Sequence, residues 1–165
     1  MSDERGQTLV LVVEDDANAR AGYLEFLTAA GFVAVGQPDG TASLAFARDT
    51  VPDIVVTDIA MPGLDGFALA AALHADERMR AVPVIGITGH WNAEMQSKAV
   101  SAGLSAMIAK PCIPSHVVAE IDQVLTRSRL MTAVLDAFDN SPLRTVPPLP
   151  AAGLRNAVRR RGDPT

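Results

Sequence analysis

VVTDIAMPGLDG, residues 55–66, ends a run of branched apolar residues on one aspartate, Asp58, and then enters a Met-Pro-Gly turn. The run DIVVTD (53–58) has the length and the side chains of a strand that is buried on both faces, as strands of a parallel sheet are. Desolvation of a carboxylate at the end of such a strand costs free energy, which suggests that the residue is there for its function. Asp58 is therefore the first candidate functional residue.

Strand-like and helix-like segments alternate on both sides of this stretch. The aliphatic runs of strand length are TLVLVV (8–13), FVAVG (32–36), DIVVTD (53–58), VPVIGIT (82–88) and LSAMIA (104–109). Segments with helical spacing or helix-forming composition follow them at 18–31, 41–48, 67–76, 91–103 and from Pro114 onward. This alternation predicts an α/β fold, a doubly wound five-stranded parallel sheet with five helices on its two faces.

The composition is that of an ordinary globular domain. The chain has 165 residues, of which 48% are hydrophobic and 20% charged, enough for one domain with a short appendage. Its single cysteine, Cys112, excludes an internal disulfide and a metal site built from several cysteines. The N-terminus lacks a signal-peptide pattern and no apolar run reaches membrane-spanning length, so we expect a cytoplasmic protein without a membrane partner.

Charge is distributed unevenly along the chain. Residues 1–126 contain 16 acidic and 7 basic residues, whereas residues 127–165 contain 7 arginines and 3 aspartates. Because an acidic body repels phosphate backbones, we expect no nucleic-acid partner. The alternative is contact through the arginines near the C-terminus, which are Arg155, Arg159, Arg160 and Arg161.

The C-terminal part of the sequence predicts a long last helix. Residues from Val117 to Phe138 alternate spacings of four and three and are apolar except for Ser128, so residues 127–139 are expected to extend the helix that opens at Pro114. Two interpretations stay open: the face pairs with a second copy in a homodimer through residues 114–139, or it folds back on its own domain. The predicted organisation is a domain over 1–126, this extension, and a flexible tail over 140–165 that is first Pro-rich and then basic.

Candidate functional residues stand at the ends of four predicted strands: Glu14 and Asp15, Asp58, Thr88, and Lys110. The carboxyl ends of parallel strands meet at one edge of the sheet, so these side chains are expected to converge. Crowded carboxylates repel each other unless a cation neutralises them, and an all-oxygen donor set suits Mg²⁺. A lysine charge and a threonine hydroxyl then complete a site that stabilises a transferring phosphoryl group, with Asp58 as the nucleophile.

Taken singly, the polar residues at the strand ends also have a plain structural interpretation. Asp16, which follows the first strand, is equally well placed to cap the next helix. Thr88 at a strand end and Lys110 in a loop are common features of proteins without such a site. The joint placement at four strand ends is what favours the functional interpretation.

The motifs VLVVEDD (10–16), DIVVTDIAMPGLDG (53–66), PVIGITG (83–89) and IAKP (108–111) resemble the receiver domain of bacterial two-component response regulators, also called the chemotaxis-type domain. The resemblance covers residues 8 to about 126. It implies a flavodoxin-like sheet with the strand order 2-1-3-4-5.

The resemblance also implies roles for individual residues. Asp58 would accept a phosphoryl group, with Mg²⁺ as cofactor, from a sensor histidine kinase or a phosphotransfer protein. Glu14 and Asp15 would form the acidic pair that holds Mg²⁺, together with Asp58 and the main-chain carbonyl of Ala60.

Two further residues complete the implied machinery. Thr88 would move to bind a phosphoryl oxygen, and Lys110 would pair with the phosphoryl group. The protein would then be a signalling switch without a separate output domain, whose phosphorylated form changes the binding of a downstream protein or the oligomeric state. It would not be an enzyme beyond its own phosphorylation and autodephosphorylation.

The sequence departs from the family pattern near the predicted site. Met107 stands where the family usually has Tyr or Phe, although a flexible methionine can fill the space that a moving threonine vacates. Cys112 follows the Lys-Pro pair in place of Phe, and Gly89 replaces the common Ala after the threonine. An interaction module with weak or no phosphorylation is therefore the alternative function. A dehalogenase-type hydrolase would need a second aspartate where the chain has Ala60.

Overall fold

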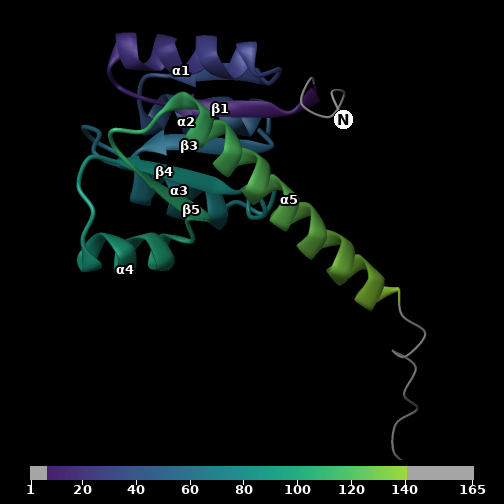
Figure 1. Ribbon diagram of the computed structural model, residues 1–165. Coiled ribbons are helices and arrows are strands. Elements are labelled where there is room, and N and C mark those ends of the chain that lie inside the picture. Colours follow the sequence, from purple (N-terminus) through teal and green to yellow (C-terminus); the bar gives the residue numbers. More distant parts are fainter. Residues whose placement is uncertain (1–6, 141–165) are drawn as a thin grey trace, which may run out of the picture. The chain divides into compact units, whose positions relative to one another are not determined.

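The computed structural model of the chain describes residues 7–140. In this part of the chain five strands alternate with five helices (Figure 1). In chain order they are β1 Leu9–Val13, α1 Ala17–Ala29, β2 Val33–Gln37, α2 Gly40–Asp49, β3 Ile54–Asp58, α3 Gly66–Ala75, β4 Val84–Thr88, α4 Ala93–Ala102, β5 Ala106–Ala109 and α5 Pro114–Asp139. The strands form one parallel sheet in the order β2-β1-β3-β4-β5, which confirms the predicted fold and strand order.

The three central strands β1, β3 and β4 are buried on both faces because most of their residues are apolar. Side chains alternate along β1: Val10 and Val12 pack in a core with α1 and α5, whereas Leu11 and Val13 pack in a core with α2 and α3. The central strands β3 and β4 are buried throughout. This two-sided packing leaves the ends of the strands as the places where polar groups of the sheet reach solvent.

Four helices begin with an aspartate or asparagine that caps the first turn. Asp16, Asp39, Asp65 and Asn92 each accept a hydrogen bond from the N–H three residues later, and such a cap contributes about 1 kcal/mol. Asp16 is therefore the cap of α1, one of the two interpretations of that residue. Three of these caps follow strands whose ends carry candidate site residues, so they also fix the loops around the site.

Helix α5 is continuous from Pro114 to Asp139, which confirms the predicted extension. Val117, Ile121 and Val124 in its first half are buried in the core. The chain divides into two units between Leu130 and Met131, inside this helix. The predicted boundary at 126 stays a prediction, and the predicted tail over 140–165 lies, apart from its first residue, outside the described residues.

Membrane association was not expected from the sequence. Among residues 7–140, no helix is both long enough and apolar enough to cross a membrane.

Candidate functional site

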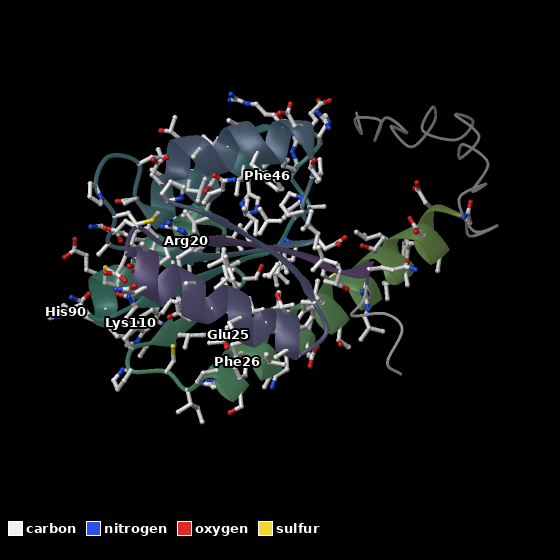
Figure 2. The ribbon with its side chains drawn as sticks, turned by 90° about the horizontal axis from the view of Figure 1, so that it is seen from above. Arg20, Glu25, Phe26, Phe46, His90 and Lys110 are labelled. Carbon is white, nitrogen blue, oxygen red and sulfur yellow. The ribbon has the colours of Figure 1, made fainter. Side chains whose placement is uncertain are left out.

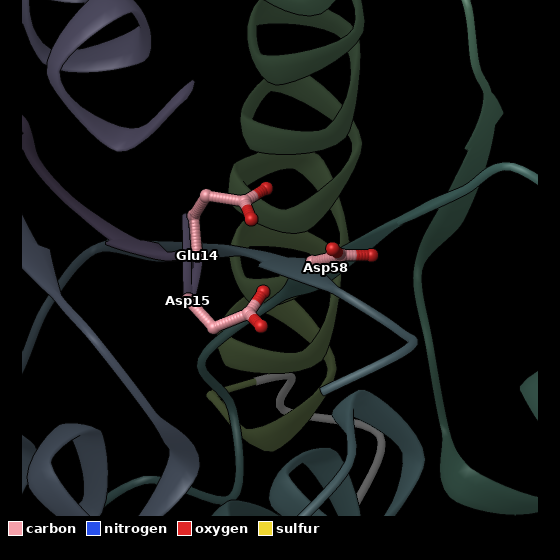
Figure 3. A group of neighbouring side chains, drawn as sticks. All are labelled: Glu14, Asp15 and Asp58. Carbon is pink, nitrogen blue, oxygen red and sulfur yellow. The ribbon is translucent and has the colours of Figure 1, made fainter. Parts of the chain in front are cut away.

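Three carboxylates meet at the carboxyl ends of β1 and β3. Glu14 and Asp15 directly follow β1, Asp58 is the last residue of β3, and the two strands are neighbours in the sheet. One carboxylate oxygen of each residue lies within 4.8 Å of those of the other two. Figure 3 shows the three side chains converging from the two strand ends. The structure thus brings together the acidic residues that the sequence predicted to converge.

Glu14 is held in place by its own neighbourhood. Its Oε1 accepts a hydrogen bond from the N–H of Asp16 at 3.1 Å, and its carbonyl oxygen accepts one from Nη1 of Arg20 at 2.8 Å. The side chain is almost fully buried, and this burial, reinforced by the charge of Asp58, raises the pKa of Glu14 despite the opposing hydrogen bond from Asp16 and charge of Lys110. The charged form of this carboxylate is therefore disfavoured by its surroundings, and a bound cation would stabilise it.

Asp58 is oriented by a donor on each oxygen. Its Oδ1 accepts from the N–H of Ala60 at 3.3 Å, and its Oδ2 accepts from Nζ of Lys110 at 3.3 Å. Only 8% of the residue is exposed, yet the carboxylate lies at the open end of the sheet. One oxygen is therefore held by the main chain of the following loop and the other by the lysine.

The turn after Asp58 owes its geometry to two glycines. Gly63 has a φ of 75°, in the left-handed region that glycine adopts without strain. Gly66 donates its N–H to the carbonyl of Ile59 at 3.1 Å, and a Cβ built on it would lie 2.6 Å from the carbonyl oxygen of Asp58. The start of α3 can therefore approach the phosphoacceptor candidate this closely only with glycine at position 66.

Lys110 brings a positive charge to the cluster from the end of β5. Besides its contact with Asp58, the Nζ of Lys110 lies 3.8 Å from Oε2 of Glu14. The main-chain N–H of Lys110 donates a hydrogen bond to the carbonyl of Thr88 at 2.7 Å. Partial burial lowers the pKa of Lys110, but attraction by Asp58 and Glu14 outweighs this and leaves the pKa above its ordinary value. The lysine is therefore charged, and 37% of its side chain is exposed.

Thr88 lies at the end of β4 and is buried, but its hydroxyl is bonded to the following loop. Its Oγ1 donates to the carbonyl of His90 at 2.9 Å and accepts from the N–H of His90 at 3.1 Å. Figure 2 shows His90 and Lys110 at the same end of the molecule. To bind a phosphoryl oxygen, the hydroxyl would have to exchange its bond to the loop carbonyl.

The donor set fits Mg²⁺ better than a softer metal. Glu14, Asp15 and Asp58 offer only carboxylate oxygens, the ligands that a hard divalent cation prefers. Ala60, the fourth predicted ligand, lies beside Asp58, since its N–H bonds to that carboxylate. The use of the Ala60 carbonyl as a ligand stays a prediction.

Sequence reasoning missed two supporting contacts. Arg20 was not singled out, although its guanidinium fixes the main chain at Glu14. Gly36 of β2 leaves space for its stem, because a Cβ there would lie 3.0 Å from the Cγ and Cδ of Arg20. A glycine inside a strand signals such a close approach, but the residue that approaches is known only from the fold.

The packing of Met107 was also not predictable from the motifs. Gly86 of β4 pairs with Met107 of β5, and a Cβ on Gly86 would collide with the Met107 sulfur and with Cδ1 of Ile59. Met107 therefore packs inward against the bare backbone of Gly86. The position that carries an aromatic residue in the resembling family is filled here by a thioether with a matching glycine.

Comparisons with known proteins agree with this geometry. Residues 10–122 match the family model of the response regulator receiver domain. The chain is 33% identical over 118 residues to the transcriptional regulatory protein PrrA of Mycobacterium leprae, covering 72% of this chain and 50% of PrrA, and so spans about half of that relative. It is 29% identical over 119 residues to the chemotaxis protein CheY of Pseudomonas aeruginosa, covering 72% of this chain and 96% of CheY.

Solved structures give the same fold. CheY4 of Vibrio cholerae superimposes with a TM-score of 0.69 at 24% identity, covering 71% of this chain and 98% of CheY4. NtrX of Brucella abortus superimposes with a TM-score of 0.71 at 29% identity, covering 78% of this chain and 29% of NtrX. With a family model matching most of its length and an acidic pocket of the type found at phosphoacceptor sites, the chain belongs to the family of response regulator receiver domains.

Proposed function

We propose that the protein is a phosphorylation-controlled switch in which Asp58 accepts a phosphoryl group from a sensor histidine kinase or a phosphotransfer protein. Receiver domains in general work with histidine kinases and are signalling modules more often than enzymes. The observation that carries the proposal is the Asp58 carboxylate, which lies within 4.8 Å of two other carboxylates and 3.3 Å from the Lys110 ammonium. Such a reaction would take place in the cytoplasm.

The transfer itself needs few groups. An oxygen of Asp58 attacks phosphorus, the bond from phosphorus to the donor histidine nitrogen breaks, and its electron pair returns to the imidazole. A Mg²⁺ ion held by Glu14, Asp15 and Asp58 would neutralise charge on the phosphoryl oxygens. Lys110 would shift its contact from the carboxylate to the new phosphoryl group, whose negatively charged oxygens would replace the carboxylate as the partner of the ammonium group.

Phosphorylation would be read out through β4 and β5. Thr88 would exchange the carbonyl of His90 for a phosphoryl oxygen, which frees the loop before α4. Met107 already packs inward against Gly86, so an inward rotation of this side chain is not available as the signal. We propose that the loop at His90, and with it the start of α4, carries the change to a downstream protein.

The positions of Thr88 and Met107 favour a second candidate function. A receiver-fold interaction module with weak or no phosphorylation needs the fold and the surface, but not the movement of Thr88 or Met107. The inward Met107 and the hydroxyl of Thr88 bonded at the loop both suit a fixed domain.

Intact-mass analysis separates the two functions. The protein is incubated with Mg²⁺ and either acetyl phosphate or phosphoramidate, alongside Asp58→Asn and a metal-free sample. Asp49→Asn is the matched control, because Asp49 is an exposed aspartate at the end of α2. A single phosphoryl adduct that requires Mg²⁺ and Asp58 but not Asp49 supports the switch. No adduct with either donor, in protein that binds Mg²⁺, favours the interaction module.

A further inference from the structure

Arg20, the fourth residue of helix α1, binds the main chain of the acidic site (Figure 2). Its Nη1 donates a hydrogen bond at 2.8 Å to the carbonyl of Glu14, six residues earlier in the chain. Glu14 as a whole is 3% exposed, so water is a poor substitute for this donor. Without the guanidinium the carbonyl would stay unsatisfied or turn toward another donor, and a turn would move the main chain at the site.

The carbonyl of Glu14 connects Arg20 to Asp15. This carbonyl and the N–H of Asp15 belong to one planar peptide group, so a donor that fixes the carbonyl also fixes the plane in which Asp15 begins. The carboxylate of Glu14 has a donor of its own, the N–H of Asp16 at 3.1 Å. Arg20 therefore acts on the direction of Asp15 more than on the carboxylate of Glu14.

Arg20 is itself held by the elements next to the site. Its main-chain N–H donates to the carbonyl of Asp16, the cap of α1, at 2.9 Å. Its stem lies against Gly36 of β2, where a Cβ would be 3.0 Å from its Cγ and Cδ. The next residue of β2, Gln37, accepts the N–H of Glu14 at 3.2 Å. One short segment of β2 thus pairs with Glu14 and leaves space for the side chain that binds its carbonyl.

We propose that Arg20 is a positioning residue of the Mg²⁺ site, which sets the direction of the Asp15 carboxylate through the peptide group between Glu14 and Asp15. The inference rests on the proposed role of these two residues as Mg²⁺ ligands. Arg20 is not a ligand, because a guanidinium carries only donors. Mg²⁺ demands near-ideal octahedral geometry, whereas Ca²⁺ tolerates a looser set of oxygens. Arg20 therefore favours Mg²⁺ over Ca²⁺ at this site.

Titration of the unphosphorylated full chain with MgCl₂ or CaCl₂ tests the proposal, with the amide chemical shifts of ¹⁵N-labelled protein as the readout. Arg20→Met keeps an unbranched stem beside Gly36 and removes the donors. It should raise the Kd for Mg²⁺ by about 10- to 100-fold, the usual cost of losing a contact that orients a metal ligand. The Kd for Ca²⁺ should rise by a smaller factor. Arg20→Lys keeps a donor, so its Kd for Mg²⁺ should lie between those of the wild type and Arg20→Met.

Arg78→Met is the matched control for a lost guanidinium. Nη1 of Arg78 donates to the carbonyl of Arg48 at 2.9 Å, which is the same kind of contact as that of Arg20. Arg78 lies in the segment that enters β4, away from the carboxyl ends of the strands. This variant should bind both ions with the wild-type Kd. A loss as large as that of Arg20→Met would show a general effect of stability and would overturn the proposal.

Gly36 gives an independent way to displace the guanidinium. Gly36→Ala keeps Arg20 but pushes its stem away, so it should also raise the Kd for Mg²⁺. In an Arg20→Met background the same substitution should leave this Kd unchanged, because no donor remains to be displaced. An equal effect in both backgrounds would contradict the proposal and assign the effect to Leu24, whose Cδ1 would lie 2.9 Å from the new Cβ.

Three further results separate this inference from the proposed switch. Arg20→Met with the wild-type Kd for Mg²⁺ would overturn the inference and leave Asp58 as the phosphoacceptor candidate. Equal losses for Mg²⁺ and Ca²⁺ would contradict the claim that Arg20 sets the geometry of the site. Asp15→Asn should weaken the binding of both ions, and a wild-type Kd in that variant would remove the ligand that Arg20 positions. Because the titration uses no phosphoryl donor, failure of Asp58 to accept a phosphoryl group would not alter its result.

Discussion

The two sides of the site differ in how far they are prepared for phosphorylation. At the ends of β1 and β3, the carboxylates of Glu14, Asp15 and Asp58 already converge, and Lys110 faces them. At the ends of β4 and β5, the hydroxyl of Thr88 is bonded to the following loop. The comparison teaches that the side that would receive the phosphoryl group is preorganised, whereas the side that would transmit it has to rearrange.

The largest expected effect lies on the receiving side. Lys110→Ala removes the one ammonium group within 4 Å of the described carboxylates Glu14 and Asp58 and should slow adduct formation from acetyl phosphate by roughly 100- to 1,000-fold, the usual cost of a lost transition-state contact. Time-resolved intact-mass analysis measures the rate. Lys98→Ala, in the exposed pair with Glu94 on α4, should keep the wild-type rate. Equal rates in the two variants would show that Lys110 takes no part.

The next effect concerns the turn that positions Asp58. Gly66→Ala should lower the free energy of unfolding by about 1–3 kcal/mol, since its Cβ would overlap the carbonyl of Asp58. Gly22→Ala in α1 meets nothing within 4 Å and should raise stability by about 0.5–1 kcal/mol. Urea unfolding of both variants checks the contrast. A stable Gly66→Ala protein would mean that α3 moves away from the site at little cost.

On the transmitting side, a double-mutant cycle sharpens the comparison. Gly86→Ala should cost about 1–3 kcal/mol, because the new Cβ displaces the Met107 sulfur. The same substitution in a Met107→Ala background should cost less, with a coupling of about 0.5–3 kcal/mol. Additive costs would show that Met107 is not packed against Gly86 in solution.

The smallest effect is a pH dependence. Burial raises the pKa of Glu14 above its usual 4.5, so the folded protein without metal binds this proton more tightly than the unfolded chain does. The ionised carboxylate then reduces stability progressively as the pH rises from about 4.5 through the folded-state pKa. Glu14→Gln should remove this loss and make the metal-free protein more stable at neutral pH.

Bound Mg²⁺ should turn the ionised Glu14 carboxylate from a destabilising group into a stabilising one. Stabilisation of the wild type by Mg²⁺ should exceed that of Glu14→Gln, because the ion binds the ionised carboxylate. Thermal unfolding with and without Mg²⁺ at neutral pH gives both numbers. The same gain in both proteins would remove Glu14 from the metal site.

The sequence predicted the receiving side because that side follows from topology. Once the strands alternate with helices, Asp15, Asp58 and Lys110 must come to one edge of the sheet, whatever the details of packing. The inward Met107 could not be foreseen, because it depends on which residue of β4 lies beside it. The register that pairs Met107 with Gly86 is a property of the assembled sheet.

The last helix shows the same division. Its length followed from the apolar spacing between Val117 and Phe138, and the structure confirms it. The sequence left open whether this face is buried or paired, since both need the same spacing. The structure shows that Val124 is buried and that Val134 is exposed, so burial accounts for the first half of the helix and pairing of the second half stays a prediction.

Localisation of the phosphoryl group tests the central claim most directly. The protein is treated with acetyl phosphate and Mg²⁺, the acyl phosphate is reduced with borohydride, and the peptides are sequenced by mass spectrometry. The account predicts that homoserine replaces aspartate at position 58 alone, and only in samples that contained Mg²⁺. Reduction at another carboxylate, or none at Asp58 in protein that carries the adduct, would contradict it.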